Sequence, residues 1–153
     1  MSIISQTNSV EHILFYEEKW YFFSNFSSFA IYWRGEDWMT SEHAYQASKF
    51  IDEATCKLVK NARSAHDAKK IARANYDKLR ADWKVLKLLF MEEILHAKLD
   101  QHLYIQQKLL ESGDALIVEN SPKDSFWGRG PDWKGENHLG RLWMKLRDEI
   151  RAK

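Results

Sequence analysis

Three ionisable side chains could do chemistry because each lies among aromatic residues: Glu42, Lys49 and Asp124. A carboxylate in such surroundings can donate and accept protons during a reaction. A lysine partly buried by apolar side chains can lose its proton and act as a nucleophilic amine. Paired carboxylates are also a frequent device for cleaving glycosidic bonds, since one protonates the leaving group while the other supports the sugar carbon or activates water. The three residues therefore point to sugar or imine chemistry.

Glu42 and Lys49 both belong to residues 40–50, TSEHAYQASKF, so this stretch must position them. Nothing in it breaks a helix. Thr40 or Ser41 is expected to cap the helix, because either hydroxyl can accept a hydrogen bond from a backbone N–H of the first turn. The competing interpretation is a solvated polar stripe, which is what most charged helical faces are. The predicted helix makes about three turns. One face carries Glu42, Gln46 (or Tyr45) and Lys49, and another carries His43, Ala47 and Phe50.

Two further segments offer polar groups from aromatic surroundings. Ser24 and Asn25 interrupt the aromatic run of residues 20–26, which predicts a loop that presents polar groups from an apolar wall. Residues 127–137 are rich in glycine, which predicts an irregular segment that folds over a ligand. Arg129 and Lys134 in this segment, together with backbone N–H groups, could contact an anionic group of a ligand.

Composition bounds the class of protein. The chain has 153 residues, 44% of them hydrophobic and 14% aromatic, and a formal net charge of +1. These values predict one globular domain over residues 1–153, with residues 1–12 as a loose lead-in, and they argue against binding of nucleic acid through a broad basic surface. Cys56 is the only cysteine, so the sequence allows no intrachain disulfide and no thiolate metal site. We expect a cytoplasmic protein with no membrane segment.

Hydrophobic periodicity predicts a small amount of strand followed by helices. Strands are expected at residues 13–16, 29–33 and 116–118, with a hairpin turn over residues 34–37. Capping signals and a period of three to four residues predict helices at 52–61, from Ser64 to near Asn75, and at 81–99, 101–111 and 138–152.

Other catalytic classes lack their motifs in this sequence. There is no P-loop, no G-x-G-x-x-G after a strand, no H-E-x-x-H and no G-x-S-x-G. Glu93 and His96 have a spacing that can ligate metal, but a carboxylate-bridged helical site needs a second copy, and we expect no metal and no cofactor. His43 is expected to support the core or the site rather than act as a base.

The motifs together resemble those of the NADAR (YbiA-like) family, in the expected order and over nearly the whole chain. The resemblance rests on residues 23–26 (FSNF), 40–50, Asp82-Trp83, Lys98-Leu99, 124–128 and 135–140 (GENHLG). It implies a compact α+β domain, mostly helical around a small β-sheet. Members of that family are N-glycosidases that act on ribosylamines, including early intermediates of the riboflavin pathway, and some remove ADP-ribose from guanine bases.

The resemblance implies that Glu42, Trp83 and Asp124 are required for catalysis and that Lys49 is the family's helix lysine, although Trp83 alone reads equally well as core. In the family an aromatic residue follows the histidine directly, whereas here Ala44 comes first and Tyr45 second. The expected substrate is a small ribosylamine phosphate or an ADP-ribosyl group, including one on guanine of DNA or RNA; the alternative is a module that binds ADP-ribose without turnover. Candidate substrate-binding residues are Ser24, Asn25, Phe26, His43, Gln46, Trp127, Gly128, Arg129 and Asn137.

Overall fold

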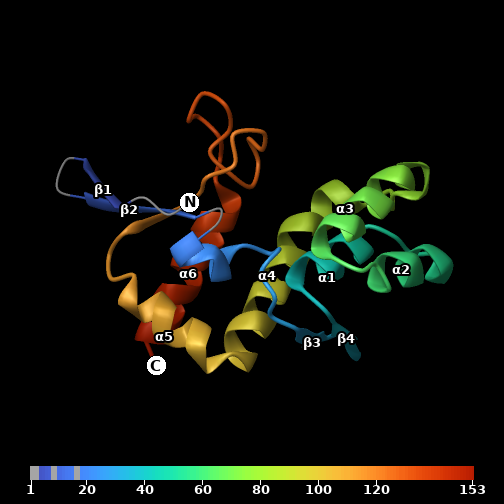
Figure 1. The fold of residues 1–153 in the computed structure, drawn as a ribbon, viewed down its shortest axis with the longest axis horizontal. Coiled ribbons are helices and arrows are strands. Elements are labelled where there is room, and N and C mark those ends of the chain that lie inside the picture. The colour runs from blue at the N-terminus through green and yellow to red at the C-terminus, as the bar shows by residue number, and fades with distance from the viewer. Residues whose placement is uncertain (1–3, 8–9, 16–17) are drawn as a thin grey trace. The chain divides into compact units, whose positions relative to one another are not determined.

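A computed structural model describes residues 4–7, 10–15 and 18–153 of the chain. The chain divides into two compact units, one of residues 1–24 with 102–153 and one of residues 25–101. Figure 1 shows the order of the elements along the chain. They are β1 (Ile4–Thr7), β2 (Val10–Phe15), the 3-10 helix η1 (Glu18–Phe23), β3 (Ile31–Trp33), β4 (Glu36–Trp38), α1 (Ser41–Ala47), α2 (Glu53–Lys60), α3 (Ala65–Ala74), the 3-10 helix η2 (Tyr76–Lys78), α4 (Trp83–Gln101), α5 (Leu103–Glu111), β5 (Leu116–Glu119) and α6 (His138–Arg151).

The first unit contains a three-stranded sheet with β2 in the centre. β1 pairs with β2 antiparallel, and β5 pairs with β2 in parallel, so that Ile13 lies opposite Ile117. Both of these isoleucines are buried, because each faces the core side of the sheet. The sequence predicted a loose lead-in over residues 1–12, but in the described part of this range residues 4–7 form β1 and residues 10–12 begin β2. The predicted strand at 13–16 ends at Phe15, and residue 16 lies outside the described part.

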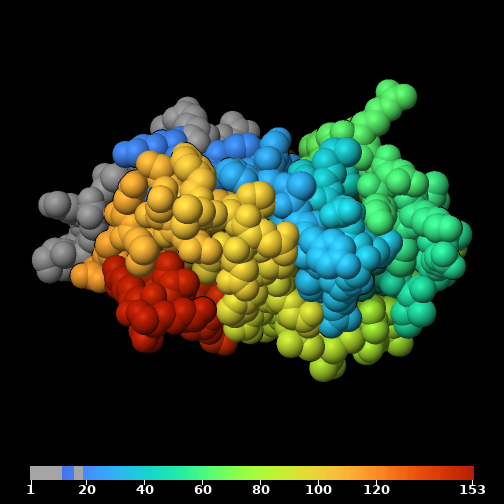
Figure 2. All heavy atoms as spheres, turned by 90° about the horizontal axis from the view of Figure 1, so that it is seen from below, coloured from blue at the N-terminus to red at the C-terminus, as the bar shows by residue number. Residues whose placement is uncertain are grey.

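Helices α5 and α6 cover this unit. They lie side by side in the space-filling view, α5 in yellow and the end of α6 in red (Figure 2). Trp143 on α6 is fully buried, contacts the ring of Phe23 at 5.1 Å, and donates its indole N–H to the Phe23 carbonyl at 3.0 Å. The buried guanidinium of Arg147 donates to the Ser112 hydroxyl and the Ala115 carbonyl, both at 2.9 Å. These bonds attach α6 to the turn that precedes β5.

The second unit is built around α1. All seven residues of α1 are buried, and the helix contacts α2, α3 and α4 (Figure 1). A helix that is buried on every side has no solvated face. The competing interpretation of residues 42–49 as a solvated polar stripe is therefore wrong.

The hairpin of β3 and β4 belongs to the same unit and turns at Arg34 and Gly35, whose φ values of 50° and 81° are those of a two-residue turn with left-handed residues. Arg34 then forms a two-pronged ion pair with Glu93 on α4, with N···O distances of 3.1 and 2.9 Å. This pair, with the Trp33 indole N–H donating to the same carboxylate at 3.3 Å, holds the hairpin against α4.

The sequence-based prediction of an α+β chain, mostly helical with small sheets, is confirmed. Ser64 caps α3 by accepting from the Asp67 N–H, as predicted, and Asn75 follows the last residue of that helix. The boundaries of the other long helices differ from the predictions by one to two residues, which is the usual scatter at helix ends. None of the helices in the described part of the chain is both long enough and apolar enough to cross a membrane.

Candidate active site

The start of α1 brings Glu42 to a fixed position. Thr40 has an extended backbone and its hydroxyl accepts a hydrogen bond from the His43 N–H, so Thr40 is the cap. The backbone N–H of Glu42, which has no partner within the helix, donates to the Asn25 carbonyl at 3.0 Å. The turn that carries Asn25 is thereby attached directly to the first turn of α1.

The carboxylate of Glu42 is buried, with 5% of the residue exposed. Its Oε1 accepts a hydrogen bond from Nε2 of Gln46 at 2.6 Å, one helical turn later. The predicted spatial pairing of Glu42 with Gln46 is therefore present. Burying a carboxylate costs free energy unless it is hydrogen-bonded, and Gln46 supplies one such bond.

Residues that bond to Glu42 carry buried oxygens of their own. Gln46 uses its amide N–H group on Glu42, which leaves its Oε1 without a hydrogen-bond partner among the described residues. Asn25 donates to Sδ of Met91 at 3.2 Å, and its Oδ1 also lacks a partner in that part of the chain. The buried Ser41 hydroxyl likewise has no hydrogen-bond partner among the described residues. An unpaired buried acceptor costs about 1–3 kcal/mol, so these groups suit a ligand that brings hydrogen-bond donors.

His43 has a structural role in this arrangement. One ring nitrogen lies 2.8 Å from the Thr40 hydroxyl and the other 3.0 Å from the Ala62 carbonyl. The ring is fully buried and joins the α1 cap to the end of α2. Both ring nitrogens are thus hydrogen-bonded within the protein, which fits a supporting role, and the candidate role of His43 in substrate binding stays a prediction.

Lys49 does not lie on the helix, contrary to the prediction of a helix of about three turns. α1 ends at Ala47, and the Lys49 N–H bonds to the Gln46 carbonyl in a tighter turn. The prediction of one common helical face for Glu42 and Lys49 is therefore wrong. The Ser48 hydroxyl donates to the Tyr45 carbonyl, which is the acceptor that the Lys49 N–H would need in a continuing helix. Beyond the helix end, the backbone carbonyl of Lys49 accepts from the Arg80 N–H at 2.9 Å.

The ammonium group of Lys49 instead lies among aromatic rings. It is 5.2 Å from the Tyr45 ring, 5.1 Å from the Tyr76 ring and 5.7 Å from the Trp83 ring. Only 6% of Lys49 is exposed. Its Nζ donates to the Tyr76 hydroxyl at 3.0 Å. The face of an aromatic ring attracts a cation, and this attraction increases as water is removed.

Trp83 is placed as a core residue, and its predicted role in catalysis stays a prediction. It is the first residue of α4, it is buried, and it packs against Phe90 at a ring distance of 6.2 Å. The same ring contacts Tyr45 at 5.4 Å and borders the Lys49 ammonium. Trp83 is thus a core residue whose ring also borders the candidate site.

Phe26 follows Asn25 and carries a half-buried ring. The ring lies 6.3 Å from that of His66, and the ammonium of Lys69 lies 5.9 Å from its centre. An apolar ring next to a lysine suits a substrate that has both a flat ring and an anionic group.

The other predicted site residues lie in the first unit. Asp124 is half-buried, and its Oδ1 accepts the N–H groups of Phe126 and Trp127 at 3.0 and 2.8 Å. This bond pattern is an Asx turn, which fixes the loop that follows. The Trp127 ring is buried and packs edge-on against Phe126 at 4.7 Å.

The glycine-rich segment 127–137 is irregular, as predicted, but it is closely tied to itself. The N–H groups of Gly130, Gly135 and Asn137 all donate to backbone carbonyls, as do those of the first two residues of α6. These N–H groups are already used within the protein, so the expected contact of this loop with an anionic group of the substrate would need its other donors and stays a prediction. A Cβ on Gly128 would lie 2.9 Å from the Glu119 carbonyl, and one on Gly135 would clash with the carbonyl of Gly128, so these glycines are needed for close packing.

Arg129 and Asn137 also brace the loop. The Arg129 guanidinium donates to Asn120 Oδ1 at 2.5 Å and to the Gly130 carbonyl at 2.9 Å, and it stacks at 4.1 Å on Trp133. The Asn137 side chain accepts from the Glu119 N–H and donates to the Ile117 carbonyl, both at 2.9 Å. Asn137 thus extends β5 rather than offering its amide to a ligand. Ser24, at the end of η1, is buried and its N–H bonds to the Tyr21 carbonyl at 2.8 Å.

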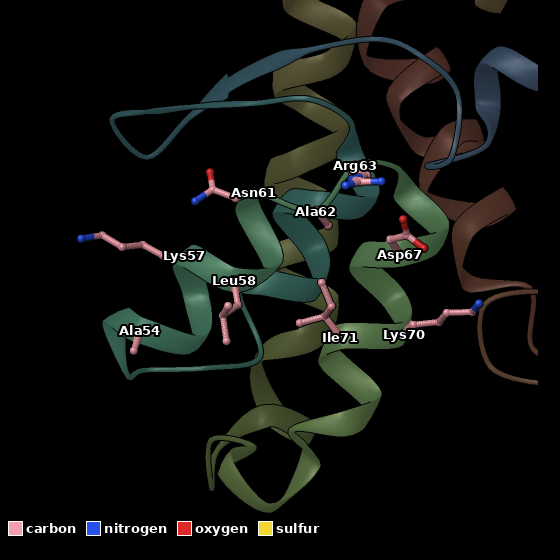
Figure 3. Close-up of a pocket in the computed structure, with 9 residues that line it drawn as sticks. All are labelled: Ala54, Lys57, Leu58, Asn61, Ala62, Arg63, Asp67, Lys70 and Ile71. Atoms are coloured by element: carbon pink, nitrogen blue, oxygen red, sulfur yellow. The ribbon is translucent and has the colours of Figure 1, made fainter.

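An open groove of about 680 Å³ lies between α2 and α3 (Figure 3). The side chains of Leu58 and Ile71 lie across it from one another, and the ammonium groups of Lys57 and Lys70 point away to either side (Figure 3). The residues that line it include none of the predicted site residues. We therefore place the candidate active site at Glu42 and not in this groove.

Sequence reasoning missed Tyr76 as a site residue. It lies 27 positions after Lys49 in η2, and the two meet only because the fold places η2 against the end of α1. The sequence marked the region of Tyr76 only through the predicted end of a helix near Asn75, and a helix end does not indicate a contact with Lys49.

Comparison with known proteins gives a consistent picture. A family model described as the NADAR domain matches residues 14–151. The chain is 43% identical over 132 residues to N-glycosidase Npun_R5314 of Nostoc punctiforme, which is 84% of this chain and 85% of that protein. It is 38% identical over 128 residues to N-glycosidase YbiA of Escherichia coli, 84% of this chain and 80% of that protein.

A third relative is longer, and one relative has a solved structure. Riboflavin biosynthesis protein VVA0006 of Vibrio vulnificus is 38% identical over 140 residues, which is 90% of this chain and 38% of that protein. The NMR structure of E. coli YbiA superposes with a TM-score of 0.84 at 36% identity, covering 92% of this chain and 84% of that chain. With a family model over residues 14–151 and N-glycosidase relatives of this identity, the chain belongs to the NADAR family and is a hydrolase of N-glycosyl bonds.

Proposed function

We propose that the chain hydrolyses the bond between C1 of a ribose and an exocyclic amine, with Glu42 as the proton-transfer group and Lys49 as the nucleophilic amine. One observation carries this proposal: the buried Glu42 is hydrogen-bonded to Gln46 and to the backbone of Asn25, and each of these two residues carries a buried side-chain oxygen that has no partner among the described residues. Ribose hydroxyls are donors, and a bound ribose would satisfy these acceptors.

The chemistry needs only water as co-reactant. An N-ribosylamine opens when the bond between C1 and the ring oxygen breaks, with Glu42 supplying the proton to that oxygen, and C1 becomes doubly bonded to the amine nitrogen. The Lys49 amine adds to C1, the original amine leaves with a proton, and C1 is then held by Lys49 as an imine. Water adds to C1, the bond from C1 to Nζ breaks, and the sugar aldehyde is released.

Trp83 and Asp124 enter this proposal through the resemblance to the family. The Trp83 ring forms one wall beside the Lys49 ammonium, and its loss would open that wall to water. Asp124 uses Oδ1 to hold the loop of residues 124–130. We propose that its charge is needed in the reaction in addition to this structural bond.

Two substrate classes fit this chemistry. The name of the Vibrio relative places that protein in riboflavin biosynthesis, which favours an early ribosylamine phosphate of that pathway for this chain too. The second class is ADP-ribose joined to guanine, in a nucleotide or in DNA or RNA, which has the same bond between C1 and an exocyclic amine. The Arg129 side chain is the group in the glycine-rich loop that would favour the diphosphate of this second class.

The test is incubation of the purified chain with each substrate, followed by detection of free ribose phosphate or ADP-ribose. Release from either class, absent in a Glu42→Gln variant, supports the proposal. Binding of ADP-ribose with no release from either substrate would instead identify a binding module.

A further inference from the structure

Lys49 has an unusual environment for a buried lysine. Three aromatic rings lie within 5.1–5.7 Å of its Nζ, and only 6% of the residue is exposed. Rings attract a cation over their whole face, but they do not fix the direction of its N–H bonds. The group that does so is the Tyr76 hydroxyl, which accepts from Nζ at 3.0 Å.

Tyr76 differs from the other two rings in its exposure. Tyr45 and Trp83 are buried, whereas 48% of Tyr76 is exposed. Tyr76 therefore forms the outer wall next to the lysine, and a Lys49 without it would be open to water on that side.

The backbone on both sides of this contact is tied together. The Arg80 N–H donates to the Lys49 carbonyl at 2.9 Å, and the Arg80 guanidinium reaches the Ser48 carbonyl at 3.5 Å. On the other side of Tyr76, the Asn75 side chain donates to the Ile71 carbonyl at 2.8 Å. These bonds fix the backbone on both sides of Tyr76 and thereby bring its ring to Lys49, and the bond from Nζ joins its hydroxyl to the amine.

We propose that Tyr76 is a positioning residue of the reaction, which holds the Lys49 amine in the one orientation from which it can reach C1 of the sugar. This inference rests on the proposed role of Lys49 as the nucleophile. An amine held only by ring faces would sample several directions, and a misdirected nucleophile loses rate rather than affinity.

The test removes one oxygen atom. Tyr76→Phe keeps the ring and its attraction for the cation but removes the acceptor of the Lys49 bond. Tyr32→Phe is the matched control, because Tyr32 is a tyrosine of the same unit with a similar exposure, 57% against 48% for Tyr76. Losing the bond that directs the amine should lower kcat roughly tenfold with KM changed by less than about twofold, whereas Tyr32→Phe should match the parent protein.

A second measurement follows Lys49 without a substrate. Purified parent and Tyr76→Phe proteins are treated briefly with an amine-acylating ester, and the modified lysines are identified by peptide mass spectrometry. Lys49 should be acylated several-fold faster in Tyr76→Phe, while the exposed Lys84 should react at the same rate in both.

The outcomes separate the two proposals. Unchanged kcat in Tyr76→Phe would overturn the positioning role, whether or not Lys49 labels faster. Unchanged labelling would show that the hydroxyl does not hold the amine and would also overturn it. No turnover by the parent protein would overturn the proposed function, and the labelling would then still decide whether Tyr76 restrains Lys49.

Discussion

Gln46 donates its amide N–H to Oε1 of Glu42 across 2.6 Å, and both residues are buried. Because the donor is an amide, this bond holds the carboxylate in place without neutralising its charge. The other side of the same amide, Gln46 Oε1, has no partner in the described part of the chain. One side chain therefore orients the candidate catalytic group and leaves an acceptor beside it for the substrate.

Glu42→Gln should lower kcat by roughly 10² or more, the scale of losing a proton-transfer group. The shape of the side chain is kept, so unfolding of the variant by heat should stay close to that of the parent. Glu53→Gln is the matched control, since Glu53 lies in the first turn of α2 but is exposed and paired with Lys57. The measurement is release of ribose phosphate or ADP-ribose. A folded Glu42→Gln protein with near-normal turnover would remove Glu42 from the mechanism.

Borohydride added during turnover should trap a covalent sugar adduct on Lys49, because it reduces the imine that joins C1 to Nζ. Peptide mass spectrometry locates the adduct, and Lys49→Ala should abolish it and lower kcat by roughly 10² or more. The double variant with Glu42→Gln should be little slower than either single variant, because both disable one step. Normal turnover in Lys49→Ala with no adduct in the parent would assign the chemistry to Glu42 and water.

Comparing Asp124→Asn with Asp124→Ala should distinguish a role of the Asp124 charge in the reaction from its role in holding the loop. Asparagine can still accept the N–H groups of Phe126 and Trp127, so the Asx turn survives. Asp124→Asn should therefore unfold at nearly the same temperature as the parent while losing turnover, and Asp124→Ala should lose both. If Asp124→Asn keeps full activity, the carboxylate serves the loop alone.

Arg129→Ala should weaken an ADP-ribosyl substrate more than a monophosphate substrate, because a diphosphate offers more acceptors to a guanidinium. Comparing kcat/KM for the two substrate classes measures this. Since Arg129 also braces the loop through Asn120 and Gly130, some loss on both is expected. Arg141→Ala, at an exposed position of α6, controls for the loss of one positive charge. Equal losses on both substrates would leave Arg129 with its structural role only.

Lys98 gives a prediction about stability. Burial lowers the pKa of its ammonium from 10.5 to about 7, and its Nζ donates to the Ser27 hydroxyl at 2.9 Å. Between about pH 7 and pH 10.5, Lys98 is protonated in the unfolded chain but not in the folded one, so the unfolding free energy rises with pH. Below about pH 7, Lys98 is protonated in both forms, and the free-energy cost of burying its charge is present in full.

Lys98→Met, which keeps the length of the side chain and removes its charge, should therefore raise the unfolding temperature more at about pH 6 than at about pH 9. Thermal unfolding followed by circular dichroism at the two pH values measures the difference. Lys84→Met, on an exposed position of the same helix α4, should show no such pH dependence. The same shift at both pH values would mean that Lys98 is charged over the whole range.

Local sequence signals determined most of the helices. Ser64 predicts the start of α3 because its hydroxyl bonds to a backbone N–H three residues later, and Asn75 marks its end. The pairing of Glu42 with Gln46 could also be predicted from the sequence, since residues four apart meet on one face of a helix. These features depend on neighbours along the chain, and no distant part of the fold has to be known.

The surroundings of Lys49 were decided by tertiary structure. The sequence placed Lys49 on a continuous helix, because residues 41–50 contain no helix breaker. The Arg80 N–H, which arrives 31 positions later, binds the Lys49 carbonyl instead, and Tyr76 receives the ammonium. Helix propensity differs by only about 1 kcal/mol per residue or less among such residues, so it does not determine where the Lys49 side chain points. The contacts with Arg80 and Tyr76 do so, and they depend on how distant segments pack.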